Sequence, residues 1–203
     1  MGMEELRRRL MNNKELYPEE TILPKSKPHK EVNTVKVQPK YGALPGIKVG
    51  AVFEFRRDLH QAGMHLGLIA GISGSKAGAY SIVLSGGYED DNDEGDTFVY
   101  IGTGGKDNSA FGSAGPQVRD QSMSHPHNSA LEESSKNGKP VRVIRGANPN
   151  SAWAPAEGYR YDGLYTVTEA TLGKGRSGFN ICQFRFVRLP GQTPLEKRNM
   201  LFY

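Results

Sequence analysis

From Tyr41 onward the chain is a series of short apolar runs separated by turns that contain glycine. Seven runs are rich in β-branched and aromatic residues: VGAVFEF (Val49–Phe55), LGLIAGI (Leu66–Ile72), YSIVL (Tyr80–Leu84), TFVYI (Thr97–Ile101), VRVIR (Val141–Arg145), LYTVTEA (Leu164–Ala170) and FNICQFRFVRL (Phe179–Leu189). Runs of this length and composition predict the strands of a barrel or a sandwich. The 25 glycines and 12 prolines agree with many turns. We therefore expect a mainly β (α+β) fold.

A few helices are expected around these strands. The predicted helices are Glu4–Leu16, Asn128–Ser135 with Asn128 as a possible N-cap and Gly138 beyond its end, and Thr193–Asn199 with the capping-box pair Thr193 and Glu196. Between the first helix and the strands, Pro18–Pro39 is polar and rich in lysine and proline. The expected organisation is an N-terminal helix and basic arm (1–40), one β domain (41–190) and a C-terminal helix or tail (191–203).

Charge and cysteine content narrow the class of protein only a little. The formal net charge is +4 and the pI is about 9.1, which is compatible with nucleic-acid binding. Cys182 is the single cysteine, so a disulfide framework is excluded and a packed thiol within a strand is expected. Without an apolar run of membrane-spanning length or a signal peptide, we expect a soluble intracellular protein with no membrane partner.

Motifs for catalysis or for cofactor binding are incomplete. Gly102–Gly105 (GTGG) lacks the third glycine of a dinucleotide fingerprint. The spacing from Asp90 to Gly95 resembles a calcium loop, but Ile101 stands where a bidentate glutamate is required. His125 and His127 are half of a metal site, with no further histidine or cysteine nearby. We expect no cofactor, no metal and no catalytic residues.

The stretch GGYEDDNDEGDTFVY (Gly86–Tyr100) stands out in a basic chain. Six of the eight residues from Glu89 to Asp96 are acidic. One interpretation is a hairpin connection kept soluble by its charges. A hairpin would also bring Tyr88 and Tyr100 towards the same end of the sheet, next to glycines that let backbone amides approach a ligand. The loop is therefore either a solvated turn or part of a binding site.

Two tyrosine rings, a carboxylate and free backbone amides suit one class of ligand. A planar heterocycle stacks on aromatic rings, and each stacked base contributes about 1–3 kcal/mol. Cytosine presents an amino donor, which a carboxylate can accept, and two acceptors, which amides can satisfy. A cytosine in a duplex must first be flipped out, which costs a few kcal/mol.

Several ordered segments resemble the SRA-YDG (SET- and RING-associated) domain family of 5-methylcytosine readers. The resemblance runs from about Tyr41 to Arg188 and rests on these segments: YGALPGIKVG (Tyr41–Gly50), LIAGISG (Leu68–Gly74), GAYSIVLSGGYEDD (Gly78–Asp91), FVYIGTGGKD (Phe98–Asp107), GKPVRVIRG (Gly138–Gly146) and WAPAEGYRYDGLY (Trp153–Tyr165). It implies a PUA-like, crescent-shaped twisted β-barrel that grips duplex DNA. The YDG tripeptide itself (Tyr161–Gly163) precedes a predicted strand and suits a turn with an architectural role.

The resemblance also implies roles for individual residues. Tyr88 and Tyr100 would hold the flipped 5-methylcytosine, and Asp91 would accept from its amino group. Backbone near Gly86, Gly87 and Ile101 would satisfy the rest of the base edge, and Gly102 and Thr103 would line the methyl pocket. Ile69 would be the thumb that fills the vacated stack.

The chain departs from the family pattern at two places. Ile101 stands where many members have threonine after the second tyrosine. Phe111, Gly112 and Ser113 occupy the finger positions where animal members carry Asn-Lys-Arg. Phenylalanine cannot make the hydrogen bonds of arginine to an orphaned guanine, so the preference between hemimethylated and fully methylated CpG stays open.

Affinity would come largely from phosphate contacts, for which Arg142, Arg145, Lys174 and Arg176 are candidates. The leading hypothesis is a non-enzymatic epigenetic reader of methylated double-stranded DNA, linked to maintenance of DNA methylation or to chromatin silencing. Its further partners would be a DNA methyltransferase or a histone-modifying protein, and it would lie in the nucleus of a eukaryote or at the nucleoid in the cytoplasm of a prokaryote. The alternatives are the recognition domain of a modification-dependent restriction endonuclease and a protein-interaction module.

Overall fold

The computed structural model describes residues 39–86, 90–107 and 115–199. The chain divides into two units, Met1–Lys36 and Val37–Tyr203, and the described residues belong to the second. The helix predicted at Glu4–Leu16 lies outside the described residues. The strands are β1 (Val52–Phe53), β2 (Ile72–Ser75), β3 (Gly78–Leu84), β4 (Asn92–Asp93), β5 (Thr97–Ile101), β6 (Val141–Gly146), β7 (Tyr159–Lys174) and β8 (Asn180–Arg188). The helices are α2 (Arg56–Gln61) and α3 (Pro126–Asn137).

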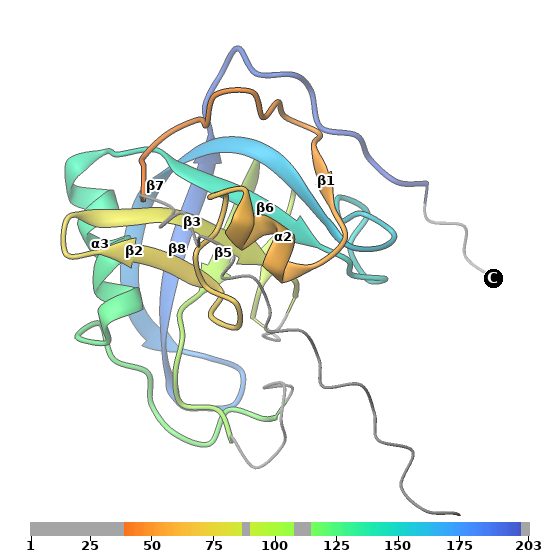
Figure 1. Cartoon of the computed structure of the whole chain (residues 1–203). Coiled ribbons are helices and arrows are strands. Elements are labelled where there is room, and N and C mark those ends of the chain that lie inside the picture. The colour runs from red at the N-terminus through yellow and green to blue at the C-terminus, as the bar shows by residue number, and fades with distance from the viewer. Residues whose placement is uncertain (1–38, 87–89, 108–114, 200–203) are drawn as a thin grey trace, which may run out of the picture. The chain divides into compact units, whose positions relative to one another are not determined.

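The eight strands form one mixed sheet, so the expected mainly β class is confirmed. The hydrogen-bonded order is β2-β3-β6-β7-β8-β5-β4, and β1 pairs with β7. The β3–β6 pair is parallel, whereas the other neighbours are antiparallel. The long strands β7 and β8 form a strongly curved ribbon along which the sheet bends (Figure 1).

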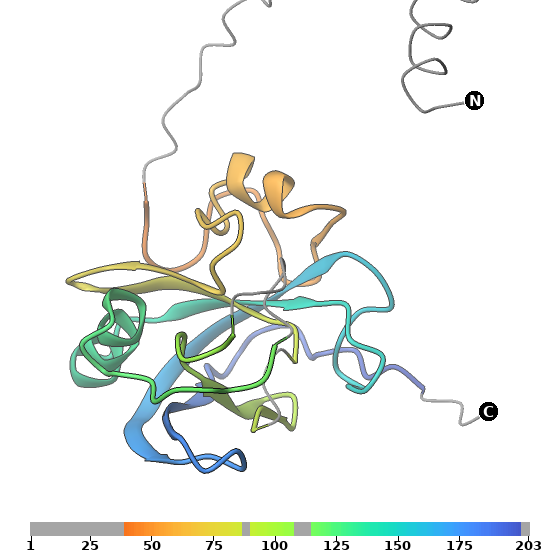
Figure 2. The same ribbon diagram turned by 90° about the horizontal axis from the view of Figure 1, so that it is seen from below.

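The two faces of the sheet carry separate cores. Successive residues of β3 point to opposite faces, so Ile82 and Leu84 join one core while Val83 joins the other. The larger core lies under α3, which contributes Ala130 and Leu131. The smaller core lies under α2 and the segment that precedes it. Figure 2 shows α2 and α3 on opposite sides of the sheet.

Most predicted strands are present, and the strongest patterns match closely. The run Thr97–Ile101 coincides with β5, and the runs beginning at Tyr80 and Val141 correspond to β3 and β6. Cys182 is a buried thiol within β8, as expected. No helix among the described residues is long and apolar enough to cross a membrane.

Two expectations for strands are wrong. Leu66–Ile72 was expected to be one strand, but β2 begins only at Ile72 and the residues before it form a loop. The acidic stretch was expected to join two paired strands, yet β3 pairs with β2 and β6, while β5 pairs with β4 and β8. The acidic stretch supplies β4 itself and pairs with β5.

The expected helix around Asn128 is confirmed with different ends. Its N-cap is His125, whose ring accepts from the His127 amide, and Gly138 ends it in the left-handed conformation (φ 67°). The helix predicted at Thr193–Asn199 is wrong. Residues 193–199 are irregular, because the Arg198 amide donates to Ala152 and the Arg198 guanidinium donates to further carbonyls of the same loop.

Candidate nucleic-acid interface

The pairing of β4 with β5 places Asp91 beside Tyr100. Asn92 lies opposite Val99 and Asp93 opposite Phe98. Continuing this register by one residue puts Asp91 opposite Tyr100. The carboxylate of Asp91 accepts the N–H of Ile101 at 3.1 Å. The Ile101 amide therefore orients the Asp91 carboxylate in this structure. Asp91 and Tyr100, two of the predicted site residues, lie together at the end of β5.

Asp91 also lies within electrostatic reach of a cation. Burial lowers the pKa of the half-buried Lys106 ammonium, whereas the charge of Asp91 acts in the opposite direction. An ionised Asp91 can only accept hydrogen bonds, which is the property that an amino group on a ligand requires.

The other acids of the loop mostly have structural partners. Asp93 accepts from both Nη2 (2.6 Å) and Nε (3.0 Å) of Arg145. Asp90 accepts from the backbone N–H of Arg176, in the turn between β7 and β8. Asp96 lies 3.6 Å from the guanidinium of Arg188. The interpretation of a merely solvated turn is therefore wrong for Asp93 and Asp90, which attach the loop to β6 and to the turn after β7, whereas the Asp96 side chain is 72% exposed.

Arg145 is the centre of a buried ion network below the acidic loop. Its guanidinium is fully buried and donates to Asp93, to the Gly95 carbonyl, to Asp162 and to the Tyr165 hydroxyl. Burial alone would lower the pKa of Arg145, but the hydrogen bonds and charges of Asp93, Tyr165 and Asp162 raise it above the ordinary value. The network fixes the position of the acidic loop over β6 and β7.

The YDG tripeptide has the expected architectural role, but it is not a turn. It lies within β7, at a shift in the register with β6. Ile144 pairs with Tyr161 and the adjacent Val143 pairs with Gly163, which leaves Asp162 without a partner on β6. Asp162 is the extra residue of this β-bulge, and its carboxylate binds both Arg145 and Arg160. The bulge thus delivers the second acid of the Arg145 network.

Tyr100 belongs to the larger core, and its hydroxyl lies beside Gly71 in the segment that precedes β2. Its side chain is 7% exposed, and its ring meets Phe186 edge-on at 6.2 Å between centroids. A Cβ added at Gly71 would lie 2.5 Å from the Tyr100 hydroxyl. Gly71 therefore leaves the space that the Tyr100 side chain needs.

Two buried amides hold the backbone of the predicted methyl pocket. Asn128 accepts from the N–H of Thr103 at 2.8 Å and donates to its carbonyl at 3.0 Å. Gln121 donates to the Gly102 carbonyl at 2.8 Å and accepts from the Cys182 amide at 2.9 Å. Because these backbone groups are satisfied within the protein, a ligand at Gly102 and Thr103 would meet a surface suited to apolar contact. Sequence reasoning missed both amides, since Asn128 was assigned to the helix cap.

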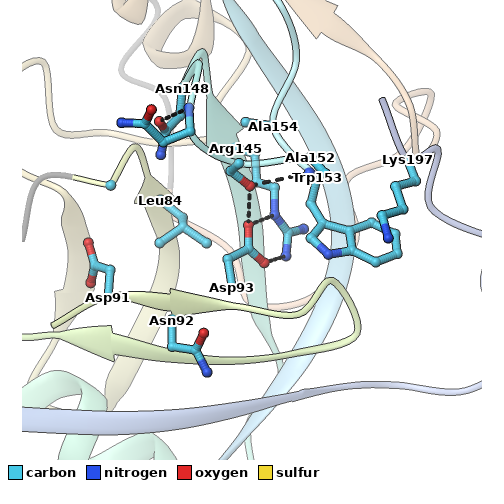
Figure 3. Close-up of a pocket in the computed structure, with 13 residues that line it drawn as sticks. Leu84, Asp91, Asn92, Asp93, Arg145, Asn148, Ala152, Trp153, Ala154 and Lys197 are labelled. Atoms are coloured by element: carbon cyan, nitrogen blue, oxygen red, sulfur yellow. Dashed lines mark hydrogen bonds and ion pairs between the residues drawn. The ribbon is translucent and has the colours of Figure 1, made fainter. Parts of the chain in front are cut away.

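A cavity of about 500 Å³ opens beside Asp91 and Gly86. This volume is in the range of small-molecule sites. Figure 3 shows Asp91, Leu84 and Asn148 around this space, with the Asp93–Arg145 pair at its base and Trp153 on the far side. Trp153 packs on Gly95, and the ammonium of Lys197 lies 5.4 Å from the centre of its ring. Trp153 is thus an anchor of the acidic loop.

The predicted thumb and finger differ in how far the structure describes them. Ile69 is 84% exposed at the tip of the loop before β2. Phe111, Gly112 and Ser113 lie outside the described residues, as do Gly87 and Tyr88. The described residues on the two sides of the finger segment pair with each other. Lys106 and Gln117 form an isolated antiparallel β-bridge, and the Asp107 amide donates to the Pro116 carbonyl.

Two of the four candidate phosphate ligands are wrong. Arg145 belongs to the buried network, and Arg142 is 1% exposed and donates to the carbonyls of Met64, Lys40 and Gly42. Burial lowers the pKa of Arg142 to about 10. Lys174 and Arg176 are exposed. Among the described residues, no group of three or more His, Cys, Asp or Glu side chains is arranged to hold a metal ion.

The fold and site together define a β-sheet binding domain with a positioned carboxylate, an aromatic ring and an exposed apolar loop near one end of β5. The model of the SAD/SRA domain family matches residues 40–192, so the chain belongs to this family.

Relatives agree with this assignment. The UHRF1-like protein of Cryptococcus neoformans var. grubii is 42% identical in an alignment 168 residues long, which covers 79% of this chain and 49% of that protein. The E3 ubiquitin-protein ligase UHRF1 of Rattus norvegicus is 41% identical in an alignment 161 residues long, which covers 71% of this chain and 21% of that protein. The chain therefore spans about half the length of these curated relatives or less.

Solved structures show the same fold. The SRA domain of SUVH5 bound to hemimethylated CG DNA is 36% identical, with a TM-score of 0.64 over 77% of this chain and 98% of that one. The modification-dependent TagI restriction endonuclease is 42% identical, with a TM-score of 0.70 over 75% of this chain and 54% of that one.

Proposed function

We propose that this chain reads 5-methylcytosine in double-stranded DNA by flipping the modified base into the site beside the acidic loop, without catalysing a reaction. The observation that carries the proposal is the Asp91 carboxylate, which Ile101 orients opposite Tyr100 in a member of the SAD/SRA family. Related SRA domains have been solved in complex with methylated DNA.

The chemistry of cytosine fits this arrangement. The exocyclic amino group donates to Asp91, and backbone amides near Gly86 and Gly87 donate to the ring nitrogen and the carbonyl. The rings of Tyr88 and Tyr100 stack on the base, which offsets the few kcal/mol needed to extrude it. The methyl group lies against Gly102 and Thr103. One methyl or methylene group in a shaped apolar pocket contributes about 1–3 kcal/mol, so we expect a preference for the methylated base of about tenfold to a hundredfold.

Further contacts hold the duplex. Ile69 enters the gap that the flipped base leaves, and the finger around Phe111, Gly112 and Ser113 faces the opposite strand. Lys174 and Arg176 are the remaining candidates for phosphate contacts. The curvature of β7 and β8 supports a PUA-like, crescent-shaped barrel in which DNA occupies the concave face (Figure 1). In a eukaryote the protein acts in the nucleus, where a DNA methyltransferase or a histone-modifying protein is a further partner. In a prokaryote it acts at the nucleoid.

The likeness to TagI favours a second candidate, the recognition part of a modification-dependent nuclease. Incubation of methylated and unmodified duplexes with the protein and Mg²⁺ or Mn²⁺ separates the candidates. Intact DNA agrees with a reader, and cleavage that requires methylation establishes the nuclease.

The pocket is tested by Asp91→Asn. The variant keeps the size of the side chain but replaces a charged acceptor, and a hydrogen bond to a charged group contributes about 1.5–3 kcal/mol. We expect the affinity for a methylated duplex to fall about tenfold to a hundredfold in a competition titration, while binding to the unmodified duplex persists. Glu94→Gln is the matched control, because it removes one charge from an exposed side chain of the same loop. Equal methyl preference in Asp91→Asn and wild type would reject the pocket.

A further inference from the structure

The loop Leu66–Ala70, called the thumb loop below, exposes apolar side chains on a fixed backbone. Ile69 is 84% exposed and Leu68 is 55% exposed. Exposed apolar side chains at one tip are typical of a contact surface. A loop that projects such residues would ordinarily be mobile, because it makes no strand pairs. The contacts of its carbonyl groups show how this loop is held.

Arg56 binds three successive carbonyls of the thumb loop. Its Nε donates to Leu68 at 3.3 Å, and its Nη2 donates to Ile69 at 3.1 Å and also to Ala70. The planar guanidinium fork presents several donors in a fixed geometry, which suits a row of carbonyls. Arg56 thereby fixes the backbone on both sides of the Ile69 side chain.

Two histidines also bind carbonyls of the thumb loop, and together with Arg56 they are called the carbonyl clamp below. His60 Nδ1 lies 2.8 Å from the Leu66 carbonyl at the start of the loop. His65 is fully buried, with Nε2 2.9 Å from the Ala70 carbonyl and Nδ1 2.8 Å from the Ser81 hydroxyl. Because a carbonyl only accepts, Nε2 of His65 carries the proton and Nδ1 accepts from Ser81. His65 thus ties the end of the thumb loop to β3.

The clamp is joined to the base site. The Gly71 carbonyl accepts from the Val83 amide at 2.8 Å, and the Tyr100 hydroxyl occupies the space beside Gly71. Arg56 lies 5.9 Å from the centre of the Tyr159 ring. Burial lowers the pKa of Arg56, while Tyr159 and Tyr100 both act to raise it. The guanidinium therefore lies beside both the thumb-loop carbonyls and the Tyr159 ring, and Gly71, next to the loop, contacts Tyr100.

We propose that Arg56 is a positioning residue that, with His65, presets the thumb loop for insertion of Ile69 into the duplex and couples that insertion to Tyr100. This inference rests on the proposed function. Binding is stronger when a loop is already ordered in its bound shape, because less conformational entropy is lost on association. Arg56 therefore supports base flipping without touching the base.

The test uses two hemimethylated duplexes of one sequence. In the first the 5-methylcytosine is paired with guanine, and in the second it lies opposite an abasic site. Extrusion of an unpaired base costs less, so the wedge contributes less to binding of the second duplex. We expect Arg56→Gln to weaken binding of the paired duplex by about tenfold or more and binding of the abasic duplex by less than about threefold. We expect the same pattern for Ile69→Ala, which removes the wedge itself. We expect the double variant to be no weaker than either single variant.

Arg57→Gln is the matched control, since it removes the same charge from the next side chain, which is 70% exposed. We expect it to change binding of the two duplexes equally. Arg56→Lys keeps the charge but not the planar fork of donors, and we expect its melting temperature to lie within a few degrees of that of the wild type. We expect its loss of affinity to differ less between the paired and the abasic duplex than the loss caused by Arg56→Gln. The inference would be overturned if the Arg56 variants lost the same factor of affinity for both duplexes. It would also be overturned if the affinity loss of the double variant equalled the product of the losses caused by Arg56→Gln and Ile69→Ala. Absence of methyl preference in the wild type would instead reject the proposed function.

Discussion

Buried polar side chains set the local geometry of the site. Asn128 and Gln121 satisfy the backbone of Gly102 and Thr103, and His65 holds the end of the thumb loop. A buried polar group is costly unless its hydrogen bonds are made. These residues therefore contribute to stability as well as to the shape of the site.

The pH dependence of folding tests the role of His65. Burial, with smaller contributions from Arg56 and Arg142, lowers the pKa of His65 to about 3. The unfolded chain binds a proton near the ordinary pKa of about 6.5. Below pH 6.5 the unfolded chain binds a proton at His65 that the folded protein does not bind until the pH approaches 3. The contribution of neutral His65 to the free energy of unfolding is therefore present above pH 6.5 and is lost as the pH falls towards 3, at about 1.4 kcal/mol per pH unit.

We expect the free energy of unfolding of the wild type to lose about 2 kcal/mol from His65 between pH 7 and pH 5. The variant His65→Gln lacks this titrating group, so the stability difference between wild type and variant narrows by that amount as the pH falls. Urea titrations at several pH values measure the difference. Parallel stability curves for the two proteins would contradict a neutral buried His65.

The acidic loop shows how an element is held by its charges. Asp93 is bound by Arg145, Asp90 by the turn after β7, and Trp153 packs on Gly95. The loop residues held in this way include β4, whose pairing with β5 places Asp91 opposite Tyr100. The described part of the loop is thus a support for one carboxylate.

Asp93→Asn is expected to destabilise the protein by about 3 kcal/mol, because it leaves the buried Arg145 with one fewer anionic partner. Asp96→Asn is the control on the same loop. Its carboxylate is 72% exposed and lies 3.6 Å from Arg188, so its loss should change stability by less than about 0.5 kcal/mol. Urea unfolding measures both variants. Equal stability of the two variants would contradict the anchoring role of Asp93.

Sequence patterns predicted the strands that pack on a core, because apolar alternation reflects burial. The runs at Thr97–Ile101 and Val141–Arg145 were placed closely for this reason. The run Leu66–Ile72 has a strand-like composition, but Arg56 and His65 take its carbonyls and keep it a loop. The short helix α2 was missed, since Arg56–Gln61 lacks apolar periodicity and buries only Leu59.

The site was predicted only in part. The role of Asp91 came from family resemblance, because spacing alone could not separate it from five neighbouring acids. Arg142 and Arg145 were taken as surface cations, since sequence does not show that a bulge brings Asp162 to Arg145 or that carbonyls surround Arg142. Long-range contacts of this kind become visible only in the folded structure.

For the whole molecule, the proposed function combines a positive net charge with a small selective pocket. The formal net charge of +4 favours association with DNA phosphates, and this part of the affinity should fall with salt. In the proposed function, the pocket adds a contribution that depends on the methyl group and not on salt. Methyl preference must therefore be measured at one fixed salt concentration.

A competition titration at fixed salt tests the central claim most directly. One duplex sequence is prepared with unmodified, hemimethylated, fully methylated and hydroxymethylated cytosine, and each form displaces a labelled hemimethylated duplex from the wild-type protein. We expect both methylated forms to bind about tenfold to a hundredfold more tightly than the unmodified form. Equal affinity for all four duplexes would contradict it.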